Sequence, residues 1–183
     1  MKNTIPTMIA ILGLAAAAPS AQGQGYNPFQ IGASGGIAFP TGDLGTGTNT
    51  GYNIAVVVGY KPQLLPISVR AEAAYNQFGR TGGGSSVNIP SFTGNVVYEL
   101  PLGMSFTPYA IGGAGLYRPS VGFNSGGATS AENDFGWNIG GGVKIPLSTS
   151  FETFVEARYN SVSVSGPNGG TASFIPVTVG ILF

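Results

Sequence analysis

The last eleven residues, Ser173-Phe174-Ile175-Pro176-Val177-Thr178-Val179-Gly180-Ile181-Leu182-Phe183, alternate between two kinds of side chain. One face of an extended strand would carry the large apolar residues Ile175, Val177, Val179, Ile181 and Phe183. The other face would carry the smaller or more polar Pro176, Thr178 and Gly180, with Leu182 as the exception. A period of two over this length predicts a β-strand whose two faces meet different surroundings.

Seven further segments resemble this strand in length and alternation. Each is close to the roughly 9–11 residues that a tilted strand needs to cross a bilayer. The eight predicted strands are residues 29–39, 52–60, 67–78, 92–100, 106–118, 135–145, 151–162 and 173–183.

The connections between these strands alternate in length. Three are short and contain a Pro-Leu or Leu-Pro pair, at residues 61–66, 101–104 and 146–149. Four are longer and rich in Gly, Ser, Thr and Asn, at residues 40–51, 79–91, 119–134 and 163–172. Tight turns on one side and longer loops on the other are typical of strand meanders that cross an outer membrane. The pattern predicts four consecutive hairpins.

The two faces of the strands decide between two kinds of closed barrel. A soluble ligand-binding barrel turns its apolar face inward, whereas a membrane barrel turns that face toward lipid. Aromatic residues cluster near strand ends on the apolar face, which is typical of interfacial girdles. The predicted girdle is Tyr52, Tyr60, Tyr75, Tyr98, Tyr109, Tyr117, Phe151 and Tyr159. We therefore predict an all-β protein, an eight-stranded antiparallel up-and-down transmembrane β-barrel.

Six charged residues share the face opposite the apolar one. A Lys or Arg that faces lipid near the bilayer midplane costs about 2–4 kcal/mol, so these residues are expected in the lumen. They are Arg70, Glu72, Glu99, Lys144, Glu156 and Arg158. Charges withdrawn from water need partners. We expect Arg70 and Glu72 to pair with each other and with Glu99, and Glu156 to pair with Arg158 near Lys144. Such a network would plug the lumen; a proton or ion pathway is the alternative.

The amino-terminal segment has the features of a secretory signal peptide. Lys2 is followed by an apolar run at residues 5–18, which is shorter than the ~20 residues of a spanning helix. Small residues offer three cleavage positions, after Ala18, Ala21 or Gly23. The expected division is a signal peptide at residues 1–23 and a barrel domain at residues 24–183.

Composition excludes several functions. Charged residues are 8% of the chain, and seven basic side chains balance seven acidic ones, so nothing indicates nucleic-acid binding. The chain has no cysteine for disulfides or thiolate sites, and no histidine to activate a serine nucleophile. Asp43, Glu132 and Asp134 are too scattered for a designed metal site. We expect no catalysis, no cofactor and no metal.

With these features, the chain resembles the small outer-membrane β-barrel family, which includes the membrane domain of OmpA and OmpX. The resemblance covers essentially the whole mature chain. Val177, Val179, Ile181 and Phe183 resemble the carboxy-terminal signal read by the barrel-assembly machinery, although Gly180 departs from the usual position of its glycine.

The resemblance also implies a location and a setting. It implies a monomer in contact with lipid in the outer membrane of a Gram-negative-type bacterium, with both termini periplasmic. We expect a structural or surface-interaction role through the four longer loops, whose sequences identify no surface ligand. The alternatives are a narrow channel for small or amphiphilic solutes and a secreted soluble β-barrel that binds an apolar ligand.

Overall fold

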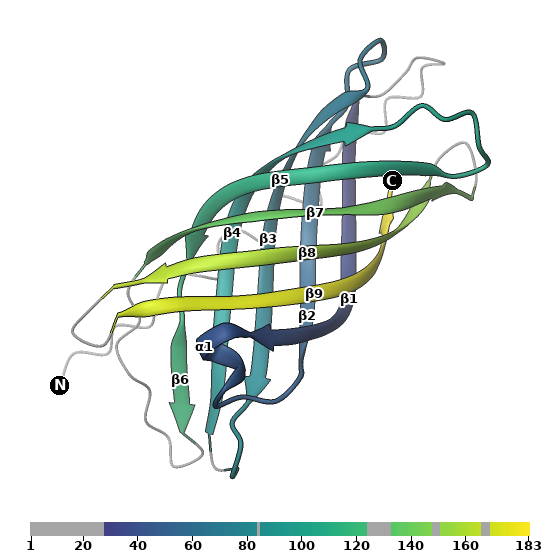
Figure 1. The fold of residues 1–183 in the computed structure, drawn as a ribbon. Coiled ribbons are helices and arrows are strands. Elements are labelled where there is room, and N and C mark those ends of the chain that lie inside the picture. Colours follow the sequence, from purple (N-terminus) through teal and green to yellow (C-terminus); the bar gives the residue numbers. More distant parts are fainter. Residues whose placement is uncertain (1–27, 84, 124–132, 148–150, 166–168) are drawn as a thin grey trace, which may run out of the picture.

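A computed structural model describes residues 28–83, 85–123, 133–147, 151–165 and 169–183 (Figure 1). The predicted signal peptide lies outside these residues. The described residues form one short helix and nine strands. They are β1 (Phe29–Thr41), α1 (Gly42–Gly45), β2 (Gly51–Tyr60), β3 (Ile67–Gly79), β4 (Ser85–Glu99), β5 (Thr107–Tyr117), β6 (Ser120–Phe123), β7 (Asp134–Pro146), β8 (Glu152–Val164) and β9 (Gly170–Leu182). Within this part of the chain, no helix is long and apolar enough to span a membrane.

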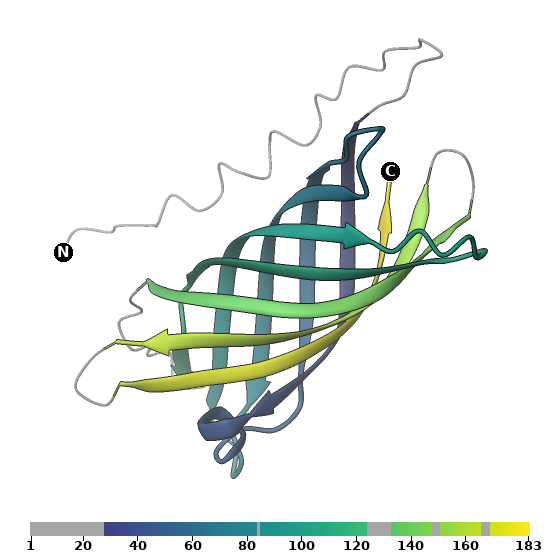
Figure 2. The ribbon, with the colours of Figure 1, turned by 45° about the horizontal axis from the view of Figure 1, so that its top comes forward.

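Eight of these strands close into a barrel. Neighbouring strands in the order β1-β2-β3-β4-β5-β7-β8-β9 are antiparallel, and β9 pairs back onto β1 from Gly32↔Leu182 to Thr41↔Ser173. Ile31 and Phe183 complete this seam with two backbone hydrogen bonds. Figure 2 shows the strands of the front and back walls crossing, because all of them tilt against the barrel axis. The predicted fold class is confirmed.

The long connections contain more strand than the sequence analysis predicted. β4 begins at Ser85 rather than at Phe92, and β6 continues the register of β5 on β4, since Tyr117 pairs with Ser91 and Ser120 with Asn88. These extensions have polar residues such as Asn88 on one face. Where the sheet rises above lipid its outer face has no need to be apolar, so the alternation that marks a membrane strand fades.

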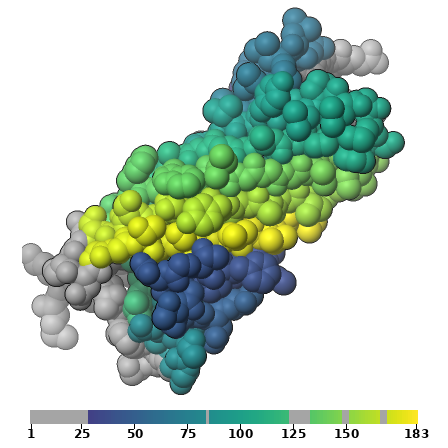
Figure 3. Space-filling model, in the orientation of Figure 1, coloured from purple at the N-terminus to yellow at the C-terminus, as the bar shows by residue number. Residues whose placement is uncertain are grey.

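Apolar side chains form the outer wall of the barrel. Ile139 is 59% exposed and Val179 is 57% exposed, and on the face drawn in Figure 3 the side chains of β7, β8, β9 and β1 form a continuous surface. Charged side chains of β7 and β8, such as Lys144 and Glu156, are buried inside. A soluble barrel would have the opposite arrangement, so this structure excludes the secreted ligand-binding alternative.

Most predicted girdle residues lie on this outer wall. Five of them have exposed side chains: Tyr52, Tyr60, Tyr98, Phe151 and Tyr159. Tyr75 packs against Tyr52 with their ring centroids 6.4 Å apart. Apart from Tyr159, which pairs with Ile139 midway along β7, these rings lie toward the two ends of the strands, where membrane interfaces would be.

The prediction was wrong for Tyr109 and Tyr117, which point into the lumen and are 3% and 1% exposed. β5 reverses the usual pattern, with large residues inside and Ala110 and Ala114 outside. The inward-facing glycines of β7 make room for both rings. A Cβ atom added at Gly142 would lie 2.7 Å from the hydroxyl oxygen of Tyr109, and one at Gly136 would lie 2.7 Å from the ring of Tyr117.

Replacing Gly136 by alanine tests this packing. We expect the free energy of unfolding to fall by about 1–3 kcal/mol, because the new methyl group collides with the Tyr117 ring and with the carbonyl oxygen of Ser161, 2.8 Å away. Urea titration in detergent micelles, followed by the fluorescence of Trp137, measures this change. Gly35→Ala is the control, since its new Cβ makes only ordinary contacts, at 3.7 Å and beyond. Equal unfolding midpoints for both variants would contradict the expectation.

Two apolar clusters lie inside the barrel, one toward each end of the strands. At the end with the longer loops, the buried cluster is Ala38, Phe78, Ile89, Tyr117, Val162, Ala172 and Phe174, with Leu44 of α1 packed against it. At the end with the short turns, it is Val57, Val97, Tyr109, Ile111, Phe154 and Leu182. Polar and charged side chains occupy the interior between and beside these clusters.

Candidate functional site

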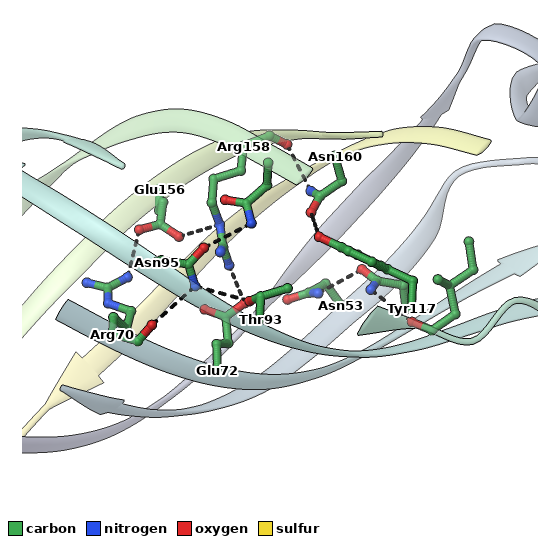
Figure 4. A network of polar contacts seen from close by, with 12 residues as sticks. Asn53, Arg70, Glu72, Thr93, Asn95, Tyr117, Glu156, Arg158 and Asn160 are labelled. Atoms are coloured by element: carbon green, nitrogen blue, oxygen red, sulfur yellow. Dashed lines mark hydrogen bonds and ion pairs between the residues drawn. The ribbon is translucent and has the colours of Figure 1, made fainter. Parts of the chain in front are cut away.

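The interior of the barrel is the candidate functional site, and four charged residues lie at its centre (Figure 4). Arg70 of β3 crosses to Glu156 of β8, with Nη1 2.8 Å from Oε2. Arg158 bonds the other oxygen of Glu156 through Nε at 2.8 Å, and its Nη2 reaches back to Glu72 of β3. These four residues, which we call the central ion-pair chain, are each at most 6% exposed and carry no net charge.

The ion pairs within the central ion-pair chain differ partly from the predicted pairs. Glu156 and Arg158 pair as expected, but Arg70 and Glu72 pair with β8 rather than with each other or with Glu99. An eight-stranded barrel is narrow enough for long side chains to meet across the lumen instead.

A second charged group lies nearer the short turns. Glu99 accepts from Lys144 at 2.5 Å through Oε1 and from Lys61 at 2.7 Å through Oε2. Lys144 is 2% exposed, whereas the Lys61 side chain is 28% exposed. Lys61 follows the end of β2 and continues the inward face of that strand, but it is not among the six charges predicted to form the lumenal network, which does include Glu99 and Lys144.

Neutral polar side chains fill the space around the ions. Asn53 donates to Asn76 at 2.7 Å, and Asn138 donates to Asn95 at 2.9 Å. These asparagines were not among the predicted site residues, although they alternate onto the same strand face as the charged residues.

The two inward tyrosines belong to the same network. Tyr109 donates to Glu156 at 2.7 Å, and Tyr117 donates to Asn160 at 2.9 Å. The guanidinium of Arg70 also lies 5.2 Å from the centre of the Phe154 ring and 5.8 Å from that of Tyr109. Aromatic faces near this cation replace part of the hydration that it loses inside the barrel.

The cavity found at this level of the interior is small. A cavity bordered by Asn53, Glu72, Asn76, Tyr117 and Asn160 measures about 10 Å³. That volume is about enough for one water molecule. With apolar clusters on both sides of it, the network closes the lumen.

Comparison with known proteins places this architecture in a family. A model of the outer membrane protein beta-barrel domain family matches residues 7–183. The chain belongs to that family. It is accordingly an integral outer-membrane β-barrel protein with a plugged lumen.

Two solved structures are similar to this outer-membrane barrel. Neisserial surface protein A (NspA) matches with a TM-score of 0.71 at 16% identity, over 87% of this chain and 98% of that one. OprG from Pseudomonas aeruginosa matches with a TM-score of 0.52 at 15% identity, over 87% and 98% of the two chains. At these identities the likeness concerns the fold. No curated protein matches the sequence.

The carboxy-terminal strand of this outer-membrane barrel faces lipid. Val177, Val179, Ile181 and Phe183 are 39–62% exposed on one face of β9. The Phe183 ring lies 6.2 Å from the ring of Phe151, between centroids. Leu182, the exception to the alternation, is buried in the interior apolar cluster.

The acidic residues of the loops form no metal centre in the described part of the chain, where no group of three or more potential ligands occurs. Asp134 is 3% exposed and accepts a hydrogen bond from the amide of Ser165 at 2.9 Å, which ties β7 to the end of β8. Asp43 lies in α1. Glu132 lies outside the described residues.

Proposed function

We propose that this barrel acts as a structural and surface-interaction protein of the outer membrane rather than as a channel. The observation that carries the proposal is the closed interior, in which the central ion-pair chain spans the lumen between two apolar clusters. A solute would have to displace paired, buried charges, and breaking such a pair costs about 3–5 kcal/mol. Interactions with other molecules are therefore made by the outer surface: the wall that faces lipid and the loops and strand extensions that lie outside the membrane.

The end with the longer loops is the proposed interaction surface. There β3, β4 and β6 extend beyond the outer girdle, and α1 covers the end of the barrel with Leu44 packed on the interior cluster. Backbone bonds from Asn49 to Gly79 and from Thr81 to Gly47 hold the β1–β2 and β3–β4 connections together. A rigid platform of this kind supports recognition by its polar tips. The surface-protein name of NspA accords with this role.

We propose that both termini are periplasmic, that residues 1–23 are removed on export, and that β9 is the strand read by the barrel-assembly machinery. The short turns lie at the end of the barrel where β9 finishes, which supports this orientation. The closed β1–β9 seam supports a monomer, because the barrel has no unpaired edge at that point.

We propose no catalytic role. The sequence has no histidine, and the lumenal carboxylates Glu72, Glu99 and Glu156 are each paired with a cation. A carboxylate held in this way is a poor general base, because its lone pairs are already occupied.

A complementation experiment tests the proposed function. A strain lacking the protein is supplied with the wild type, or with a variant in which residues 80–84 are replaced by Asn-Gly. We expect the wild type to restore envelope resistance to detergent and cell-surface adhesion. The shortened variant should restore the first and lose most of the second. Small-sugar uptake should be equal in all strains. Uptake that rises with the wild type and with the shortened variant alike would overturn the proposal in favour of a channel.

A further inference from the structure

The lipid-facing wall carries an apolar groove of about 460 Å³ over β2, β3, β4 and β5. Residues that border it include Phe29, Tyr60, Val69, Ala71, Gly94 and Val96. All six are exposed on the outer face of the barrel.

The sheet register explains how the groove is built. One cross-strand row runs from Val58 through Ala71, Gly94 and Ala114 to Trp137. Between Val58 and Trp137, which are four strand spacings or about 19 Å apart, no side chain in this row is larger than a methyl group. A Cβ atom added at Gly94 would have no other heavy atom within 4 Å.

Larger side chains border this row on both sides. Toward the longer loops lies the pair Phe92 and Leu116, 61% and 52% exposed. Toward the short turns lie Val69 and Val96, which pair with each other. Tyr60 pairs with Val69 on the other side, and its ring packs edge-on against Phe29 with centroids 5.3 Å apart. The groove therefore has defined rims.

We propose that this groove holds one acyl chain of a phospholipid more tightly than the surrounding wall holds lipid. The groove is continuous with the lipid-facing wall of an outer-membrane protein, so hydrocarbon is the material in contact with it. A flexible chain can follow the floor of Ala71, Gly94 and Gly112 and restore the dispersion contacts that an empty depression would lose. A second copy of the barrel would bring a convex wall, which leaves a void above a concave floor.

The position of the groove selects the lipid. It lies toward Phe29 and Tyr60, near the short turns. In the orientation proposed above, on which this step rests, that half of the barrel meets the periplasmic leaflet. The occupant is then a phospholipid rather than the lipid A of the outer leaflet.

Lipid retention tests the proposal. Wild-type protein, Gly94→Leu and Ala71→Leu are refolded with equimolar phosphatidylethanolamine and lipid A, and analysed by native mass spectrometry. Heat-modifiable migration on a denaturing gel checks that each barrel has folded. Two variants that fill the groove are used, so that the test still holds if one of them does not fold. We expect one phospholipid on the wild type and at least a tenfold loss from both variants. Gly35→Leu, on the outer face of β1 and outside the groove, should retain the lipid.

The single tryptophan gives a second readout. Trp137 ends the row of small residues, so a brominated acyl chain in the groove should quench its fluorescence. With dibrominated phosphatidylethanolamine at low mole fraction, quenching should be at least twofold stronger in the wild type than in Gly94→Leu. Equal retention and quenching in all variants, or a retained mass equal to a second protein copy, would overturn the proposal. Retention of lipid A instead would overturn the phospholipid assignment and the proposed orientation. Conductance with phospholipid retained would overturn only the proposed function.

Discussion

Arg158→Met should lower the free energy of unfolding by about 3–5 kcal/mol. Arg158 is 6% exposed and is bonded to both Glu72 and Glu156. Methionine keeps much of the volume but leaves Glu72 without the cation that it faces, inside a closed lumen. Glu156 retains Arg70 and Tyr109, so the loss should come mainly from Glu72. Urea unfolding of the refolded protein in micelles measures the effect.

Two further variants identify the cause. Arg158→Met combined with Glu72→Gln restores neutrality, and we expect it to recover at least half of the lost stability. Lys61→Met removes a cation that is 28% exposed and leaves Glu99 with Lys144, so it should cost about 1 kcal/mol or less. If Arg158→Met and Lys61→Met were equally stable, the central ion-pair chain would have no special role in the barrel.

Ile139→Arg should lower the free energy of unfolding in phospholipid vesicles by about 2–4 kcal/mol. Ile139 is 59% exposed on the outer face of β7, and it lies midway along the strand between Phe135 and Val143. A guanidinium at that position must either enter hydrocarbon or pull water into it. Equilibrium unfolding from vesicles is the measurement, because in micelles the free-energy cost of the charge does not report its depth in a bilayer.

Phe135→Arg is the matched control on the same strand and the same face. Phe135 is 62% exposed but lies near the end of β7, where a charge costs about 0–1 kcal/mol. Ile139→Ala separates the loss of apolar area from the gain of charge. An equal cost at both positions would mean that β7 does not cross the bilayer at the depth that its sequence indicates.

Much of the fold could be predicted because alternation and strand length reflect the same physical demand along the whole chain. Val179 must face lipid and Thr178 must not, and this difference repeats along the other strands, with β5 as the exception. Closure also followed from β9, since a strand with an apolar outer face and an aromatic end needs a partner for its edge. The unusual inward turn of Leu182 was visible in the sequence, but its partners Val57 and Val97 were not.

The partners across the lumen could not be predicted, because parity gives the face of a side chain and not the strand that lies opposite. Arg70 meets Glu156 across the interior, 86 positions later in the chain. That pairing depends on the tilt and stagger of all eight strands together. Tyr109 and Tyr117 were misplaced for a related reason. Their inward position depends on Gly142 and Gly136 of the neighbouring β7, and rules applied to one strand at a time do not include that neighbour.

Single-channel recording in planar bilayers tests the closed lumen most directly. We expect refolded protein to insert without a stable open level, because the central ion-pair chain and the two apolar clusters fill the lumen around a cavity of about 10 Å³. Insertion is verified in the same preparation by heat-modifiable migration. A reproducible open level that persists across independent insertions of the wild-type protein would contradict the account.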